Sequence, residues 1–129
     1  MNVQRLENFK KAILRLNEAV TNFNIDTKNS FSRDALIQRF EVTFELAWKC
    51  LADYLIMQGM VMENRFPRQV IKLAFSGNLI KDEAVWLKIL QSRNLMSHIY
   101  DETVADAIAG DIANQYAVVI SDLLEILKK

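Results

Sequence analysis

The sequence predicts an all-α protein, built as an antiparallel up-and-down four-helix bundle with one extra short helix. Apolar residues recur at alternating steps of three and four along four long stretches, which is the spacing of one face of an α-helix. No stretch shows the alternation of a β-strand, and the chain has only three glycines and one proline. Because 129 residues suffice for one hydrophobic core, we expect a single domain over residues 1–129.

The first helix is expected from Val3 to Phe23. A polar stretch from Asn22 to Ser32 then predicts a loop, with Ser30 or Ser32 capping the helix that follows. The first helix would pack along one apolar stripe, which consists of Leu6, Phe9, Ile13, Leu16, Val20 and Phe23.

The second helix is expected from about Arg33 to Gln58, with Gly59 as its natural end. Its apolar stripe is broad and rich in aromatic residues, which predicts the most buried element of the bundle. Cys50 lies in this stretch and is expected to be a small core residue, since a single cysteine cannot form an internal disulfide. The stripe consists of Leu36, Phe40, Phe44, Ala47, Trp48, Leu51 and Leu55.

The second helix also carries the segment RFEVTFELAWK, from Arg39 to Lys49. Its spacing stacks Glu41 on Glu45 and allows Glu45 to pair with Lys49. Two carboxylates one turn apart can form a metal site or an acid/base pair, but no second carboxylate motif completes a di-metal site, so a structural role is favoured. Glu45 or Arg39 is also a candidate for orienting the polar residues of the fourth helix.

A short third helix is expected from Pro67 to Ser76, because proline suits the first turn of a helix and Gly77 its end. This is the most basic part of the chain and the best candidate for contacting phosphates, although a charged surface helix is the simpler interpretation. Its basic residues are Arg65, Arg68 and Lys72.

The last two helices are expected from Lys81 to about His98 and from Asp101 to Lys129, the latter with Thr103 as a plausible cap. The apolar stripe of the last helix consists of Val104, Ile108, Ile112, Tyr116, Val119, Leu123 and Ile126.

The end of the fourth helix carries the segment RNLMSHIY, from Arg93 to Tyr100, which holds the only histidine of the chain. Arg93 and Tyr100 fall on nearly the same face of the helix, Asn94 and His98 share a neighbouring face, and Ser97 lies between these pairs. Burying a cation and an imidazole without partners is costly, so these residues must pair internally, face a cleft or meet another chain. A helix-capping histidine and a solvated arginine are the simpler alternatives.

Composition limits the classes of function. Sixteen basic and sixteen acidic side chains cancel, which argues against broad nonspecific nucleic-acid binding without excluding a local basic patch. One cysteine and one histidine cannot form a zinc cluster, and no glycine-rich phosphate loop is present, so we expect no metal or cofactor. No stretch approaches the ~18 apolar residues of a membrane span, and the N-terminus lacks the features of a signal peptide, which predicts a cytoplasmic protein without membrane contact.

Two segments together resemble the HEPN family, in its branch of nucleotidyltransferase substrate-binding proteins. In that branch RFExxFExxWK on the second helix precedes RNxxSHxY on the fourth, and here the segments 39–49 and 93–100 match both without a gap. The resemblance covers essentially the whole chain. It implies a homodimer whose Arg-x4-His motifs meet across the interface, and a complex with a minimal nucleotidyltransferase (MNT), with a heterotetramer as a further candidate assembly.

The resemblance also implies an activity, that of the toxin in a HEPN/MNT toxin–antitoxin pair, a metal-independent ribonuclease. Arg93 and His98 would be its catalytic residues, with Asn94 and Ser97 supporting them, and the MNT would silence it by adding AMP to Tyr100. The residue chemistry agrees, because an imidazole can act as base or acid near neutral pH and a guanidinium can hold two phosphate oxygens.

Two alternatives remain open. The chain can be a catalytically silent subunit that binds a nucleotidyltransferase and helps to present its substrate, or a helical dimer of structural role, which leaves the polar segment unexplained. The intact motif favours the ribonuclease. The acidic residues Asp101, Glu102 and Asp106 directly after the motif count against avid RNA binding unless they point away from it.

Overall fold

The computed structural model describes residues 1–62, 65–98 and 101–128, except for the side chains of residues 97 and 98, and all regular elements in these ranges are helices. The predicted all-α class and helical bundle are therefore confirmed. The helices are α1 (Val3–Ile25), α2 (Ser30–Met57), α3 (Pro67–Ser76), α4 (Glu83–His98), α5 (Glu102–Asp111), a π-helical turn η1 (Ile112–Tyr116) and α6 (Ala117–Leu127).

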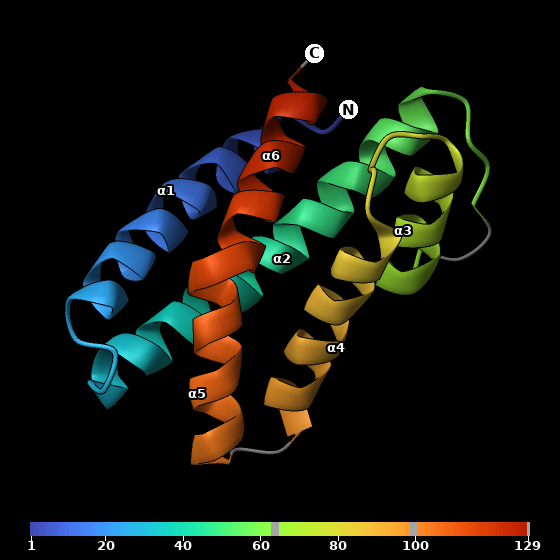
Figure 1. Ribbon diagram of the computed structural model, residues 1–129. Helices are drawn as coiled ribbons and strands as arrows, with labels where there is room; N and C mark the ends of the chain where they lie inside the picture. Colours follow the sequence, from blue (N-terminus) through green and yellow to red (C-terminus); the bar gives the residue numbers. More distant parts are fainter. Residues whose placement is uncertain (63–64, 99–100, 129) are drawn as a thin grey trace.

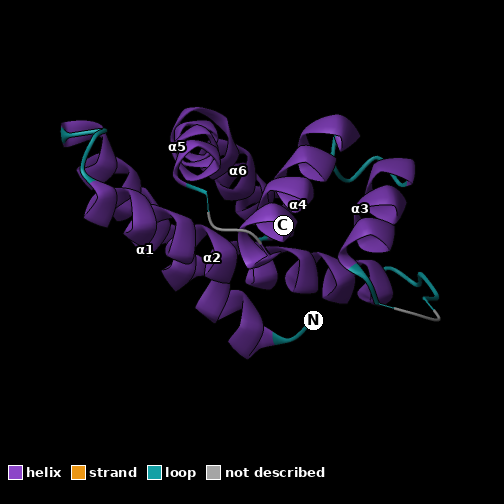
Figure 2. Cartoon of the chain, turned by 90° about the horizontal axis from the view of Figure 1, so that it is seen from below, coloured by secondary structure: helices purple, strands orange, loops and turns teal. Residues whose placement is uncertain are grey.

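The long helix α2 is the central element of the bundle. It packs against α1 on one side and against α5, η1 and α6 on the other, and at the far end α3 contacts both α2 and α4 (Figure 1, Figure 2). Phe44 of α2 contacts Trp86 of α4, with ring centroids 6.5 Å apart. The C-terminal end of α4 and the start of α5 lie at the same end of the bundle (Figure 1).

The buried face of each helix follows the apolar spacing of the sequence. All seven residues predicted for the α2 stripe are buried, and Phe40, Phe44, Ala47 and Leu51 are fully inaccessible. Cys50 is also fully buried, and burial raises the pKa of its thiol to about 12, with the nearby Asp53 carboxylate acting in the same direction. Cys50 is therefore a core residue, as predicted, rather than a reactive thiol.

Two predicted helix caps are wrong. The cap of α2 is Asn29, whose side-chain oxygen accepts hydrogen bonds from the backbone N–H groups of Phe31 and Ser32, so neither Ser30 nor Ser32 has that role. Likewise Asp101 caps α5, where the prediction gave Thr103. In both places the cap lies one or more residues earlier than expected, and Asn and Asp are strong N-cap residues.

The observed helix ends differ from the predicted ones by only a few residues. Helix α1 continues to Ile25, which shortens the loop before α2 to residues 26–29. Helix α3 has the predicted bounds, and Gly59 follows α2 with the positive φ of 94° that glycine accommodates.

The predicted last helix contains a π-helical turn, η1, between α5 and α6. Ile108, Ile112, Tyr116 and Ile120 are all buried although they follow one another at steps of four. Four-residue steps drift around a regular α-helix by about 40° each, and the wider π turn corrects that drift. It also lets the Tyr116 hydroxyl reach the Ser92 hydroxyl of α4 at 3.2 Å, inside the core.

Candidate active site

An ion pair between α4 and α2 lies at the start of the polar segment. The guanidinium of Arg93 donates to Glu45 Oε1, a carboxylate forty-eight residues earlier in the chain. Both side chains are half-buried, with exposed fractions of 24% for Arg93 and 34% for Glu45. The Arg93 guanidinium also lies 5.9 Å from the centre of the Phe44 ring, so a cation on this helix is held in a defined position.

The carboxylate that holds Arg93 is itself held by Trp48. The indole N–H of Trp48 donates to the second oxygen, Glu45 Oε2, at 2.7 Å. The predicted Glu45–Lys49 pair is not what forms: Glu45 pairs with Arg93, and the Lys49 ammonium lies 5.8 Å from the centre of the Trp48 ring. A planar guanidinium matches a carboxylate better than an ammonium does, and Trp48 fixes the carboxylate toward α4.

Glu41 lies one turn before Glu45 on the same helix. Partial burial raises the pKa of Glu41, and the positive charge of Arg93 acts in the opposite direction. The two carboxylates of the second-helix segment thus lie in different environments, one bound to a cation and an indole and the other partly desolvated.

Arg39 does not lie at this site. Its guanidinium donates to the backbone carbonyl of Arg15 at 2.8 Å and approaches Glu18 at 3.5 Å, and both partners belong to α1. Of the two candidates for orienting Arg93, Glu45 forms an ion pair with it in the described part of the chain, so Glu45 is the residue that orients Arg93.

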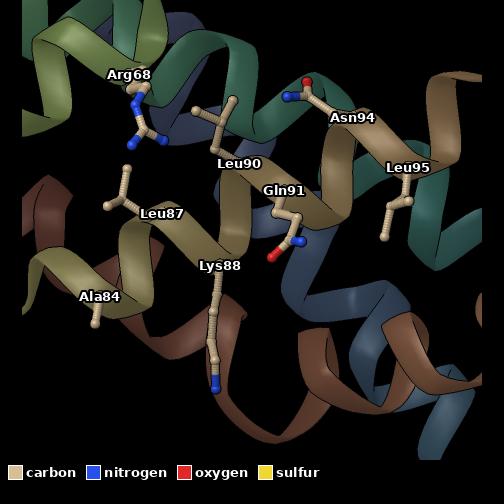
Figure 3. Close-up of a pocket in the computed structure, with 8 residues that line it drawn as sticks. All are labelled: Arg68, Ala84, Leu87, Lys88, Leu90, Gln91, Asn94 and Leu95. Carbon is tan, nitrogen blue, oxygen red and sulfur yellow. The ribbon is translucent and has the colours of Figure 1, made fainter.

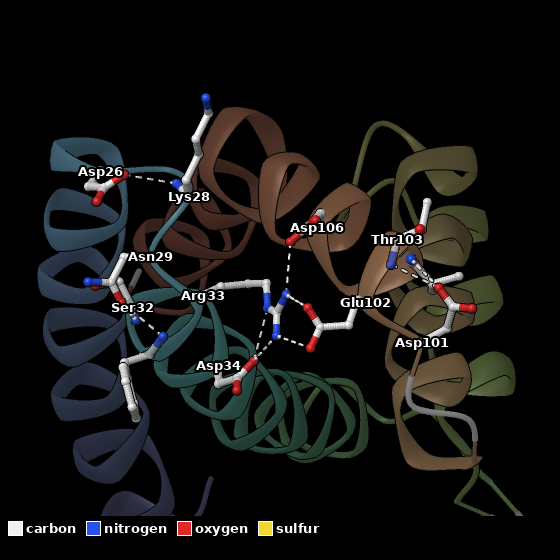
Figure 4. Close-up of polar contacts among 12 residues, drawn as sticks. Asp26, Lys28, Asn29, Ser32, Arg33, Asp34, Asp101, Glu102, Thr103 and Asp106 are labelled. Carbon is white, nitrogen blue, oxygen red and sulfur yellow. Dashed lines mark hydrogen bonds and ion pairs between the residues drawn. The ribbon is translucent and has the colours of Figure 1, made fainter.

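A second cluster surrounds Arg33, near the start of α5. The Arg33 side chain is only 4% exposed, and its guanidinium donates to Glu102 and Asp106 of α5 and to the neighbouring Asp34 (Figure 4). Hydrogen bonds to Glu102 and Asp106 raise the pKa of Arg33, so it stays charged. With Asp101 capping α5, all three acidic residues after the motif are bound within the chain.

Arg33 was predicted only as the start of the second helix. A signal for its role was present, because Arg33 continues the buried stripe of Leu36 and Phe40 at helical spacing. A buried cation on an apolar stripe needs carboxylates nearby, and Glu102 and Asp106 of α5 supply them.

Within the described part of the chain no group of three or more His, Cys, Asp or Glu residues is arranged to hold a metal ion. None of the helices described is both long and apolar enough to cross a membrane.

The family model described as "Nucleotidyltransferase substrate binding protein like" matches residues 4–129. The chain belongs to this family. The resemblance predicted from the two motifs is therefore confirmed. No curated protein sequence matches the chain significantly.

Solved structures with the same fold include a protein of Thermus thermophilus, with 34% sequence identity and a TM-score of 0.82 over 94% of this chain and 99% of that one. A tri-AMPylated HEPN toxin of Shewanella oneidensis, solved in complex with its MNT antitoxin, is 16% identical with a TM-score of 0.79 over 99% and 98% of the two chains. A toxin–antitoxin complex with AMP-PNP is 15% identical with a TM-score of 0.78 over 98% and 99%. This family member thus shares the fold of HEPN toxins.

The structure brings some of the predicted site residues together. Asn94 lies on the last turns of α4 (Figure 3) and is exposed. Its side-chain oxygen accepts a hydrogen bond from the Arg93 guanidinium at 3.0 Å. The backbone of α4 remains helical through His98, so the regular spacing assumed for Ser97 and His98 holds up to that residue. The side chains of Ser97 and His98, and all of Tyr100, lie outside the described residues, and their roles in this family member stay predictions.

Proposed function

We propose that the chain is the HEPN component of a HEPN/MNT toxin–antitoxin pair, a metal-independent ribonuclease that acts in the cytoplasm through Arg93 and His98. The observation that carries the proposal is the Glu45–Arg93–Asn94 arrangement. A guanidinium held in a partly exposed position, five residues before a histidine on the same helix, is suited to bind a phosphate rather than to stabilise a core.

The reaction needs three groups. A base removes the proton of the RNA 2′-hydroxyl, whose oxygen attacks the adjacent phosphorus, and an acid protonates the 5′-oxygen as its bond to phosphorus breaks. His98 can act as base or acid near neutral pH. Arg93 binds the phosphate oxygens as negative charge develops on them, and Glu45 sets the direction of its guanidinium plane. Asn94 and Ser97 are supporting hydrogen-bonding residues.

A homodimer supplies what one chain lacks. One chain has one histidine, whereas two chains related by a two-fold axis contribute a base and an acid to one cleft. The contacts of Arg33 with Glu102 and Asp106 support RNA access, because these carboxylates are engaged with a cation instead of facing the phosphates alone.

The proposed partner is a minimal nucleotidyltransferase, bound to the dimer in a heterotetramer. Support comes from the family to which the chain belongs and from the fold that it shares with a HEPN toxin solved in complex with its MNT antitoxin. In this proposal the partner silences the toxin by transferring AMP to Tyr100, seven residues after Arg93. The added phosphate would lie near Arg93 and compete with RNA for it.

The second candidate function is a non-catalytic subunit that binds the nucleotidyltransferase and presents its substrate. The family description favours it, since it names substrate binding and no hydrolysis. Both functions share the nucleotidyltransferase partner and differ in whether the chain alone damages RNA.

Expression of the chain without a nucleotidyltransferase tests the proposal. We expect growth arrest and fragmented RNA, with both effects abolished in Arg93→Ala and His98→Ala chains that remain folded dimers. Co-expression of the partner should restore growth, and Tyr100→Phe should prevent that rescue if AMP transfer is the mechanism. Intact RNA and normal growth at high expression of the unmodified chain would overturn the ribonuclease and leave the non-catalytic subunit.

A further inference from the structure

A groove of about 640 Å³ runs between α3 and the exposed face of α4 (Figure 3). Its α4 wall extends from Ala84 to Leu95, which at the helical rise corresponds to about 16 Å. The groove is lined by Arg68 of α3 and by Ala84, Leu87, Lys88, Leu90, Gln91, Asn94 and Leu95 of α4. It gives a role to Arg68 of the basic helix α3, which the proposed catalytic residues leave without one.

The charge of the groove is positive. Arg68 extends from α3 toward Leu87, while Lys88 projects from the α4 side (Figure 3), and both cations are exposed. Among the described residues neither has an ion-pair partner, and none of the described lining residues is acidic. In a chain of zero net charge this local excess favours an anionic ligand.

The apolar and amide side chains of the groove indicate which kind of anion it binds. Leu87 and Leu95 give the groove an accessible apolar surface, Leu95 being 43% exposed, and the amides of Gln91 and Asn94 offer both donors and acceptors. A free phosphate would use only the cations. A single-stranded nucleic acid would use all three kinds of group, because its unpaired bases present flat apolar faces and hydrogen-bonding edges beside the phosphates.

The groove is continuous with the candidate active site. Asn94 lines its end and at the same time accepts the hydrogen bond from Arg93. We propose that the α3–α4 groove binds the single-stranded RNA that flanks the cleaved phosphate, with Arg68 and Lys88 on its phosphates and the leucines against its bases. The proposal rests on the proposed ribonuclease function and names the path that its substrate takes.

Binding of a fluorescent, fully 2′-O-methylated single-stranded RNA tests the groove separately from catalysis, because methylation removes the attacking hydroxyl. In the full-length protein, Arg68→Gln with Lys88→Gln should weaken binding about tenfold and should lower the slope of log affinity against log salt by about 1.4, the value for two lost phosphate contacts. The matched control is Lys11→Gln with Lys28→Gln, two exposed lysines on the α1 side, which should change neither quantity.

The outcomes separate the two proposals. Unchanged affinity and salt slope in the groove variant, or no binding of this RNA by the unmodified chain, would overturn the groove assignment even if the chain cleaves RNA. Groove-dependent binding by a chain that cleaves no RNA would support the groove and overturn the ribonuclease. If the groove variant loses dimerisation by light scattering while its RNA affinity is unchanged, the groove is a protein interface and the assignment is wrong.

Discussion

Replacing Glu45 by alanine should destabilise the protein more than replacing Arg93 by alanine, although the two side chains form one ion pair. Without Glu45 the indole N–H of Trp48, a residue only 8% exposed, loses its acceptor, which costs about 1–3 kcal/mol. Arg93 loses its ion pair with Glu45 as well, but it is 24% exposed and can be hydrated, so this adds only about 0.5–1 kcal/mol. The expected total is about 1.5–4 kcal/mol for Glu45→Ala.

Arg93→Ala should lower the free energy of unfolding by less than Glu45→Ala does. Glu45 keeps its bond to Trp48 and is 34% exposed, so its carboxylate can be hydrated. Loss of the ion pair and of the contact with the Phe44 ring should cost about 1–2 kcal/mol. Glu45→Gln, which retains an acceptor for Trp48, should cost about 1 kcal/mol.

Urea unfolding followed by far-UV circular dichroism, at one protein concentration, measures these differences. With an m-value of about 1–3 kcal/mol/M, Glu45→Ala should lower the urea midpoint by roughly 0.5–4 M. The control is Glu18→Ala, which removes an exposed partner of Arg39 and should change stability by less than about 0.5 kcal/mol. If Arg93→Ala proves as destabilising as Glu45→Ala, the assignment of Glu45 as the shared acceptor is wrong.

Three further predictions concern the Arg33 cluster, Cys50 and Glu41. Alanine at both Glu102 and Asp106 removes two of the carboxylates that bind the buried Arg33 cation and keeps Asp34, and it should cost about 2–3 kcal/mol in urea unfolding. Arg33→Met should cost about 1 kcal/mol or less, because Glu102 and Asp106 are 74% and 65% exposed and can be hydrated. The reverse order of the two costs would contradict this account. Cys50, with its pKa raised to about 12, should react with a thiol reagent at about pH 8 only after unfolding, and rapid labelling of the native protein would count against its burial. Because the pKa of Glu41 is raised on folding, ionisation of its carboxyl group destabilises the native state, so Glu41→Gln should increase the free energy of unfolding at neutral pH. This gain should disappear as the pH falls through the raised pKa toward 4.5, the ordinary pKa of the group. A gain that does not depend on pH would refute the assignment.

The helices could be predicted from the sequence because each buries one stripe against α2 or its neighbours. The spacing of apolar residues can be read from the sequence alone, and residues placed on the stripe by that spacing, such as Phe40, Phe44 and Leu51, are buried in the structure. The helix starts were less accurate, since Asn29 and Asp101 compete as caps with hydroxyl residues a few positions away.

The candidate site could be predicted only as a set of residues. Arg93 and Asn94 followed from the motif, but the partner of Arg93 depends on how α2 and α4 pack, and local spacing favoured Lys49 for Glu45. The π turn is reflected in the sequence by apolar residues four apart, at Ile108, Ile112 and Tyr116. It was not predicted, because a regular α-helix also places residues four apart on roughly the same face. Arg33 was not recognised because its partners lie sixty-nine and seventy-three residues away.

Cleavage of RNA by the purified chain tests the central claim most directly. The protein is incubated with single-stranded RNA in the presence of EDTA, and the ends of the products are analysed. Attack of the 2′-oxygen on phosphorus predicts fragments with 2′,3′-cyclic phosphate and 5′-hydroxyl ends. The unmodified chain should form these fragments, and Arg93→Ala and His98→Ala chains of equal dimer content should not. Uncleaved RNA with the unmodified chain, or equal cleavage by the two variants, would contradict the claim that Arg93 and His98 form a ribonuclease site.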